Sequence, residues 1–308
     1  MLVLRDDLRG ERADRCGANF EADAERSLEL ALLIGDRYGE ALSRHDVAWA
    51  ASLIADSERS VSEYERAIQV YSEIGNTAGA SPSILNLAAG LGWCGDYGEA
   101  FRLLDEHEAL ALEQPWGTLQ MEAHRGSLLL RAGRLEPAER HLLLAREHAQ
   151  QLETAPYAAH IQVRLAEIDA RSGRLEQARA GLILAKAALE RLELPSSVAE
   201  VDALSARVQA EMQNPAGARH SIAAATASLA ASPSLELSTK FWWDLAAASA
   251  LIGDAPAAHG FAQSAARKFC DEALAMRADL AECYGRLPWH VDAFAYLAGR
   301  EVSLTLAG

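Results

Sequence analysis

Apolar and polar residues recur along most of this chain with the spacing of amphipathic helices, and turn residues interrupt that pattern at regular intervals. A first set of interruptions recurs every 38 to 40 residues, at Ala55, Gly95, Gly133, Gly173, Gln213 and Gly253. A second set lies about midway between them, at Gly35, Gly75, Pro115, Pro156, Pro195 and Pro233. Helical segments of about 15 residues fit into every interval. The pattern therefore predicts an all-α chain built from helical hairpins.

The turn within each hairpin has a recognisable composition. The segment Gly133–Ala138 (GRLEPA) returns forty residues later as Gly173–Ala178 (GRLEQA). Glycine supplies the left-handed backbone that ends a helix, and a polar residue followed by Glu suits the start of the next. Each such segment is expected to join the two helices of one repeat.

Fixed positions around these turns hold small residues. The slots lie seven residues before the turn residue and five and twelve residues after it. Three slots in six repeats give eighteen positions, and all except His107 hold Ala, Gly or Ser. The position nine residues after the turn is larger, as at Leu104, Leu142 and Leu182. Small residues let two helices approach at their crossing, while a larger side chain fills the neighbouring groove.

This small–small–large–small spacing around a Gly-polar turn resembles the tetratricopeptide repeat (TPR) between about residues 36 and 270. The period is about 40 residues instead of 34. Long repeats of this kind resemble the sensor segments of bacterial signal-transduction ATPases and related transcription activators, as do inter-repeat turns such as Tyr71–Asn76. The resemblance implies a right-handed helical-hairpin solenoid with about six full repeats and terminal capping helices.

Three segments are expected on this basis. Residues 1–18 are charged and carry little periodicity, so they form an arm or a frayed helix. Residues 19–270 form the TPR-like array. Residues 271–308 form C-terminal capping helices continuous with the array, because the end repeat of a solenoid must be covered.

Charge and hydropathy narrow the function. The net charge of −15 and the pI near 5.1 argue against direct binding to nucleic acid or to an anionic membrane. The sequence has no signal-peptide core and no stretch that is long and charge-free enough to span a bilayer. A cytoplasmic protein is the expectation.

Catalytic and metal-binding motifs are missing from the sequence. There is no G-x-x-x-x-G-K-[ST], G-x-S-x-G or H-E-x-x-H motif, and the four cysteines lack metal-ligand spacing. We therefore expect a protein that is not an enzyme and needs no cofactor or metal.

The candidate binding surface is the concave face, which the first helix of each repeat lines in a stacked array. His160, Arg164 and Arg171 share one helix face, and guanidinium groups suit carboxylates or phosphates. Internal pairing with Glu167 and Glu211 is the alternative. The candidates are Trp49, Asn86, Trp93, His124, Arg131, His160, Arg164, Arg171, Arg207 and Trp243.

The tryptophans among these candidates are either anchors for a ligand or packing between repeats. Trp242 occupies a core position and is expected to be packed, whereas Trp243 is expected to be exposed toward the concave face.

Two functions follow. The first is a scaffold or adaptor that binds a protein or peptide, including an acidic one, on its concave face. The second is a regulatory module of a bacterial signalling or transcription system, in which a small ligand or peptide changes the curvature of the array. A homo-oligomer remains an alternative, since exposed terminal repeats often pair with those of a second copy.

Overall fold

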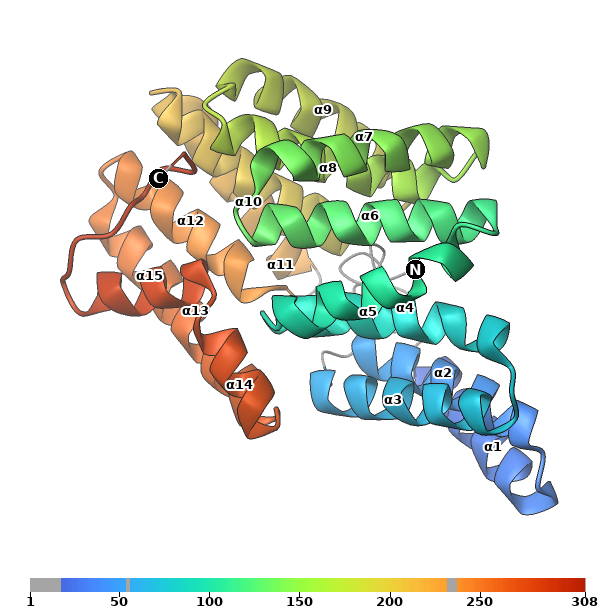
Figure 1. Ribbon diagram of the computed structural model, residues 1–308. Coiled ribbons are helices and arrows are strands. Elements are labelled where there is room, and N and C mark those ends of the chain that lie inside the picture. The colour runs from blue at the N-terminus through green and yellow to red at the C-terminus, as the bar shows by residue number, and fades with distance from the viewer. Residues whose placement is uncertain (1–17, 54–55, 232–236, 308) are drawn as a thin grey trace.

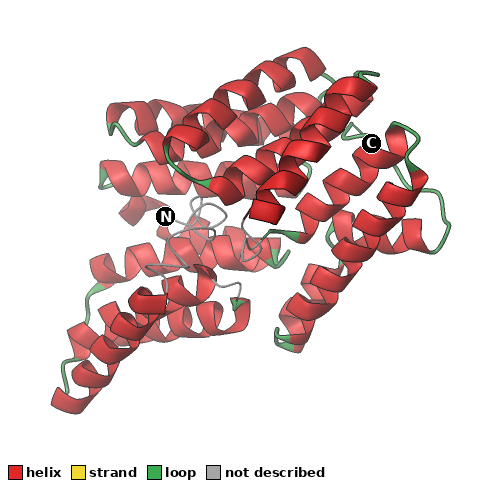
Figure 2. Cartoon of the chain, turned by 180° about the vertical axis from the view of Figure 1, so that it is seen from behind, coloured by secondary structure: helices red, strands yellow, loops and turns green. Residues whose placement is uncertain are grey.

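A computed structural model describes residues 18–53, 56–231 and 237–307 of the chain. The expected N-terminal arm, and the turn positions Ala55 and Pro233, lie outside these residues apart from residue 18. Figure 2 shows that the regular structure of the described part is helical throughout. The all-α prediction is confirmed.

The described residues form fifteen helices, of which twelve pair into six hairpins (Figure 1). The first helices of the hairpins are α2 (Arg37–Leu53), α4 (Thr77–Trp93), α6 (Pro115–Arg131), α8 (Ala155–Arg171), α10 (Pro195–Glu211) and α12 (Thr239–Leu251). The second helices are α3 (Ser57–Glu73), α5 (Tyr97–Ala111), α7 (Leu135–Gln151), α9 (Leu175–Arg191), α11 (Pro215–Ala231) and α13 (Ala255–Leu274). The helices outside the hairpins are α1 (Ala18–Ile34), α14 (Ala278–Gly285) and α15 (Pro288–Leu297).

The hairpin turns adopt the expected backbone. Gly95, Gly133, Gly173 and Gly253 have φ between 76° and 87°, and Gln213 adopts the same left-handed region with φ 57°. The polar residue after the turn varies in its role. The carboxylate of Asp96 accepts a hydrogen bond from the amide of the residue three positions on and caps α5, whereas the corresponding arginines before α7 and α9 make no side-chain cap.

The small residues lie where two helices cross. A Cβ atom at Gly126 on α6 would lie 2.7 Å from Cγ of Leu142 on α7. Ala138 and Ala145 on α7 are fully buried beside Leu142. This arrangement explains the small–large alternation of the sequence, because the backbones of α6 and α7 come too close for larger side chains.

First helices also approach one another. A Cβ at Gly92 on α4 would fall 1.8 Å from Cδ2 of Leu128 on α6. In sequence order, α4, α6, α8 and α10 each contact the next first helix. Their inward side chains therefore form one continuous surface.

The C-terminal part returns to the early repeats (Figure 1). Leu280 on α14 belongs to the same core cluster as Ile84 and Leu91 on α4. The amide of Arg277 donates to the Glu58 carboxylate on α3 at 2.9 Å, and its guanidinium lies 3.4 Å from Glu65. The capping segment therefore covers α12 and α13 with α15 and also bridges to α3 and α4.

None of the helices in the described ranges combines the length and apolar composition that crossing a bilayer requires.

The left-handed turn residues make a direct test of the fold. Gly173 and Gly260 both have free space around the methyl group that an alanine would add, but Gly173 has φ +76° and Gly260 lies inside α13. Gly173→Ala is expected to lower the free energy of unfolding by about 1 kcal/mol, because L-residues avoid this backbone region. The matched control Gly260→Ala is expected to raise it by up to about 1 kcal/mol through helix propensity. Urea denaturation of both variants measures the two changes, and equal effects would contradict the turn geometry.

Candidate functional site

A cavity of about 250 Å³ lies between the first helices of the later repeats and the returning C-terminal segment. Its floor comes from α6, α8, α10 and α12, and its cover comes from α15 and the residues that follow it. The lining residues are Arg131, Glu167, Arg171, Arg207, Lys240, Trp243, Pro288, Trp289, Asp292, Ser303, Thr305 and Leu306. Four of these side chains are cationic and two are carboxylates, so the lining is net positive within a chain of net charge −15.

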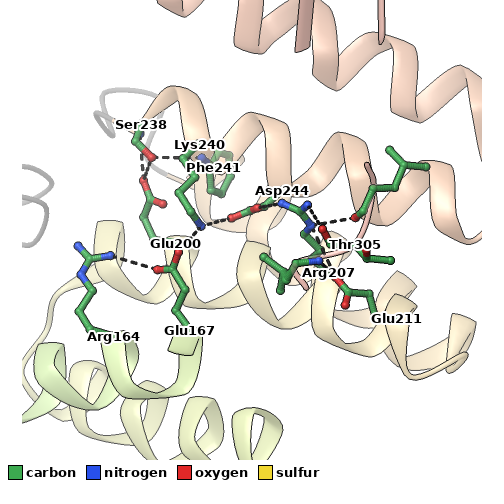
Figure 3. Close-up of polar contacts among 12 residues, drawn as sticks. Arg164, Glu167, Glu200, Arg207, Glu211, Ser238, Lys240, Phe241, Asp244 and Thr305 are labelled. Atoms are coloured by element: carbon green, nitrogen blue, oxygen red, sulfur yellow. Dashed lines mark hydrogen bonds and ion pairs between the residues drawn. The ribbon is translucent and has the colours of Figure 1, made fainter. Parts of the chain in front are cut away.

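Charged side chains of alternating sign follow one another across this surface from Arg164 to Glu211 (Figure 3). We call this row the charge ladder. Its contacts run from Arg164 to Glu167 (3.7 Å), to Lys240 (3.6 Å), to Asp244 (2.7 Å), to Arg207 (2.9 Å) and to Glu211 (3.8 Å). The ladder links α8, α12 and α10, and Asp244 at its centre is only 2% exposed. Each charge has an opposite neighbour, which offsets part of the cost of removing it from water.

The ladder also shifts the pKa values of its members. Burial alone would raise the pKa of the Glu167 carboxyl, but the charges of Lys240, Arg164 and Arg171 outweigh it and lower that pKa to about 2. Burial would likewise lower the pKa of Lys240, yet Asp244 and Glu167 raise it. Both groups are therefore held in their charged forms.

Arg131 lies between two tryptophans at the edge of the cavity. Its guanidinium carbon is 4.2 Å from the ring centroid of Trp93 on α4 and 5.3 Å from that of Trp289 on α15. Such stacking is attractive because the ring face is electronegative. Arg171, in the same slot of the next repeat, donates to the backbone carbonyl of Leu130 at 2.7 Å. Stacking and hydrogen bonding thus fix the orientation of both guanidinium groups.

The structure brings half of the predicted site residues together. Arg131, Arg171, Arg207 and Trp243 line the cavity, and Trp93 stacks on Arg131. The other predicted residues lie elsewhere on the first helices: Trp49, Asn86, His124, His160 and Arg164. Trp49 is at the far end of the array, where its ring contacts Phe20 of α1 at 4.6 Å.

Several expectations about exposure need correction. Trp243 is 1% exposed instead of open to the concave face, because α15 returns over it and Tyr296 packs against its ring at 6.1 Å. Trp242 is packed as expected: it is partly buried, contacts the rings of Phe241 and Phe261, and packs against two core clusters.

Three further predicted site residues are enclosed. His160 is buried, and Asn86 and His124 are 1% and 2% exposed. The last two lie on α4 and α6, two first helices that contact each other.

Two of the predicted arginines face carboxylates of the chain instead of forming an exposed row on the concave face. Arg164 faces Glu167 and Arg207 faces Glu211, as the internal-pairing alternative anticipated. Asp244 adds a second carboxylate to Arg207. Arg164 and Arg207 are therefore paired with carboxylates of the same chain.

Sequence reasoning missed Trp289, Asp292 and the segment after α15 as parts of the site. These residues reach the cavity only because the chain turns back after α13, which the repeat pattern does not encode. One signal was present in the sequence. Val302, Leu304 and Leu306 alternate with polar residues, which is the pattern of an extended segment with one buried face.

These features define the class of the fold: a TPR-like helical-repeat array with a charged cavity on its first helices. Its solved structural neighbours share that architecture at low sequence identity. No protein-family model matches the chain, and neither does any curated protein sequence.

Three solved structures illustrate the likeness. A Rap protein complexed with Competence and Sporulation Factor superposes with a TM-score of 0.62 at 14% identity, covering 85% of this chain and 74% of that one. Aspartyl phosphate phosphatase F from Bacillus subtilis gives 0.61 at 14% identity, covering 91% and 75%. The Rap conjugation gene regulator of plasmid pLS20, in complex with the Phr* peptide, gives 0.59 at 14% identity, covering 85% and 72%. At such identity the likeness establishes the fold.

Removing the central carboxylate of the charge ladder tests its contribution to stability. Asp244→Ala leaves Lys240 and Arg207 without their shared partner in a buried setting, so we expect a loss of about 3 kcal/mol in the free energy of unfolding. The control is Glu136→Ala, which breaks an exposed pair with Arg140 and is expected to cost less than about 1 kcal/mol. Chemical denaturation measures both, and a small loss for Asp244→Ala would show that the ladder contributes little.

His290 on α15 makes stability depend on pH. Burial against the rings of Tyr284 (4.3 Å) and Phe269 (4.8 Å), together with the charge of Arg131, lowers its pKa to about 3. Because the unfolded chain binds this proton near pH 6.5 and the folded chain does not, the contribution of His290 is complete above pH 6.5 and is lost as the pH falls toward 3.

The slope in that range is at most about 1.4 kcal/mol per pH unit for this residue. His290→Phe keeps a ring in the cluster and removes the titration. Unfolding free energies of both proteins between pH 6.5 and 4.5 are expected to show a shallower decline for the variant. Parallel curves would mean that His290 is protonated in the folded protein.

Proposed function

We propose that this chain is a non-enzymatic regulatory scaffold that binds a peptide on its concave face. The observation that carries the proposal is the net positive cavity formed by four neighbouring first helices. Arg131 and Arg171 present oriented guanidinium groups there, and Trp289 lines the cavity beside Arg131. Carboxylates are the groups that such a surface binds best, so the favoured partner is an acidic peptide.

The size and lining of the cavity favour a peptide over a compact metabolite. Its volume of about 250 Å³ is below the roughly 300–1,000 Å³ of typical small-molecule sites. Half of its twelve lining residues carry a charge, a larger share than the few polar groups of a typical small-molecule pocket. A peptide needs only to place one or two side chains in such a cavity while its backbone runs along the helices.

Structural neighbours support a regulatory role. Two of them were solved with bound factors, one with Competence and Sporulation Factor and one with the Phr* peptide, and the second is described as a conjugation gene regulator. We extend from them the proposal that this chain takes part in bacterial signalling through a bound peptide. The sequence resemblance to sensor segments of signal-transduction ATPases and transcription activators points in the same direction.

A peptide array tests this function. Fluorescein-labelled hexapeptides in acidic, neutral and basic versions are titrated with the full chain, and fluorescence anisotropy reports binding. Acidic peptides are expected to bind, and their affinity should fall as salt is raised, because exposed charges are screened. Equal binding of the acidic and basic versions would contradict the proposal.

A matched pair of variants locates the site. Arg171→Gln removes a cavity cation, and we expect at least about tenfold weaker binding, the effect of losing one charged hydrogen bond. Arg179→Gln makes the same change at an arginine of α9 that pairs with Glu176 outside the cavity, and is expected to bind as the wild type does. Equal losses in both variants would place the peptide elsewhere.

A further inference from the structure

The segment that follows α15 already lies on the candidate site as an extended chain. Gly299 ends the helix with φ +69°, the Arg300 amide still donates to the Ala295 carbonyl oxygen of α15 at 2.9 Å, and residues 301–304 belong to neither a helix nor a strand. Val302, Leu304 and Leu306 are half-buried, whereas Ser303 and Thr305 are exposed. Over residues 301–304 this alternation is that of an extended peptide with one face against a surface, and residues 305–307 then form a bend and a turn.

Helix α10 holds this segment by its backbone. Arg207 donates from Nε to the Leu304 carbonyl oxygen at 3.1 Å and from Nη2 to the Thr305 carbonyl oxygen at 3.2 Å. One turn further along α10, an oxygen of the Glu211 carboxylate accepts a hydrogen bond from the Leu306 amide at 2.6 Å. Contacts to backbone groups are available to any extended chain and do not depend on its sequence.

The apolar side chains of Val302, Leu304 and Leu306 must be spaced two residues apart to reach their contacts. Val302 and Leu304 pack against the core cluster that contains Trp243 on α12, and Leu306 packs against the cluster that contains Leu204 on α10. The segment therefore crosses from one first helix to the next. Ser303, Thr305 and Leu306 also line the 250 Å³ cavity, so this segment and the candidate site share one surface.

We propose that residues 300–307 are an internal ligand, which occupies in cis a groove for an extended peptide with apolar residues at three alternate positions. This inference rests on the proposed peptide-binding function and specifies the partner beyond its charge. A partner peptide enters by displacing the segment: its backbone takes over the bonds to Arg207 and Glu211, and its apolar side chains replace those of Val302, Leu304 and Leu306.

The test uses a fluorescein-labelled peptide with the sequence of residues 300–307 (REVSLTLA). It is titrated into the wild-type chain and into the triple variant Val302→Ser/Leu304→Ser/Leu306→Ser, which weakens the hold on the internal segment. The triple variant is expected to bind the peptide at least tenfold more tightly than the wild type. A peptide of the same composition with its three apolar residues adjacent is expected not to bind.

The control variant Glu301→Ala changes an exposed position of the same segment that does not line the cavity, and it is expected to bind like the wild type. Circular dichroism and thermal melting establish that each variant is folded.

Hydrogen exchange on the wild type gives a second measurement that needs no variant. Adding excess peptide is expected to speed exchange at the Leu306 amide, because its bond to Glu211 is released.

The outcomes separate the two proposals. If acidic peptides bind the wild type but the triple variant shows no gain for the segment peptide, the internal ligand is refuted and the proposed function stands. If no peptide binds either form, both are refuted. Unchanged exchange at the Leu306 amide under saturating peptide would refute displacement even if the triple variant fails to fold.

Discussion

The close crossing of helices at small residues is the constraint on which the rest of this structure depends. A Cβ atom at Gly126 would lie 2.7 Å from Cγ of Leu142, and one at Gly92 would lie 1.8 Å from Cδ2 of Leu128, so a larger residue at either position would force its neighbour to move. These contacts set the distance between α4, α6 and α7 and, repeated along the chain, keep the first helices in register. Arg131 and Arg171 occupy one slot in successive repeats for this reason. The repeated packing thus brings the inward-facing positions of successive repeats together, and cationic residues at those positions make the cavity positive.

Repetition alone does not complete the site. A solenoid stacks neighbours in series, and its inward charges would face solvent. Here the chain turns back after α13, so α15 covers Trp243 and the following residues contact Arg207. Burying Arg207 is costly unless its donors are satisfied. Asp244 and two backbone carbonyls supply those acceptors, and only one of the three comes from the repeats.

The difference between the repeats and the returning C-terminal segment explains which features the sequence predicts and which it does not. Helices, turns and the inward direction of Arg131, Arg171 and Arg207 follow from local periodicity, since each repeat determines its own geometry. The burial of Trp243 depends on Tyr296, more than fifty residues away, and no periodic signal specifies that contact. Pairing of Arg164 with Glu167 was visible as a spacing of three on one helix, but the link from Glu167 to Lys240 on α12 needs the stacked array. Local periodicity therefore predicts the helical array, whereas the burial of the cavity depends on the returning C-terminal segment.

This arrangement ties the occupant of the cavity to the closure of the array. Arg277 contacts Glu58 and Glu65 on α3, while Trp289 on α15 stacks on Arg131. Both contacts belong to the capping segment that also leads into residues 300–307. Because neighbouring repeats contact only one another, the array resists bending weakly, and a few contacts across the opening have a large effect on its curvature. Under the proposed displacement of residues 300–307, a peptide would act on the segment that makes those contacts, and recognition and curvature would share one structural element.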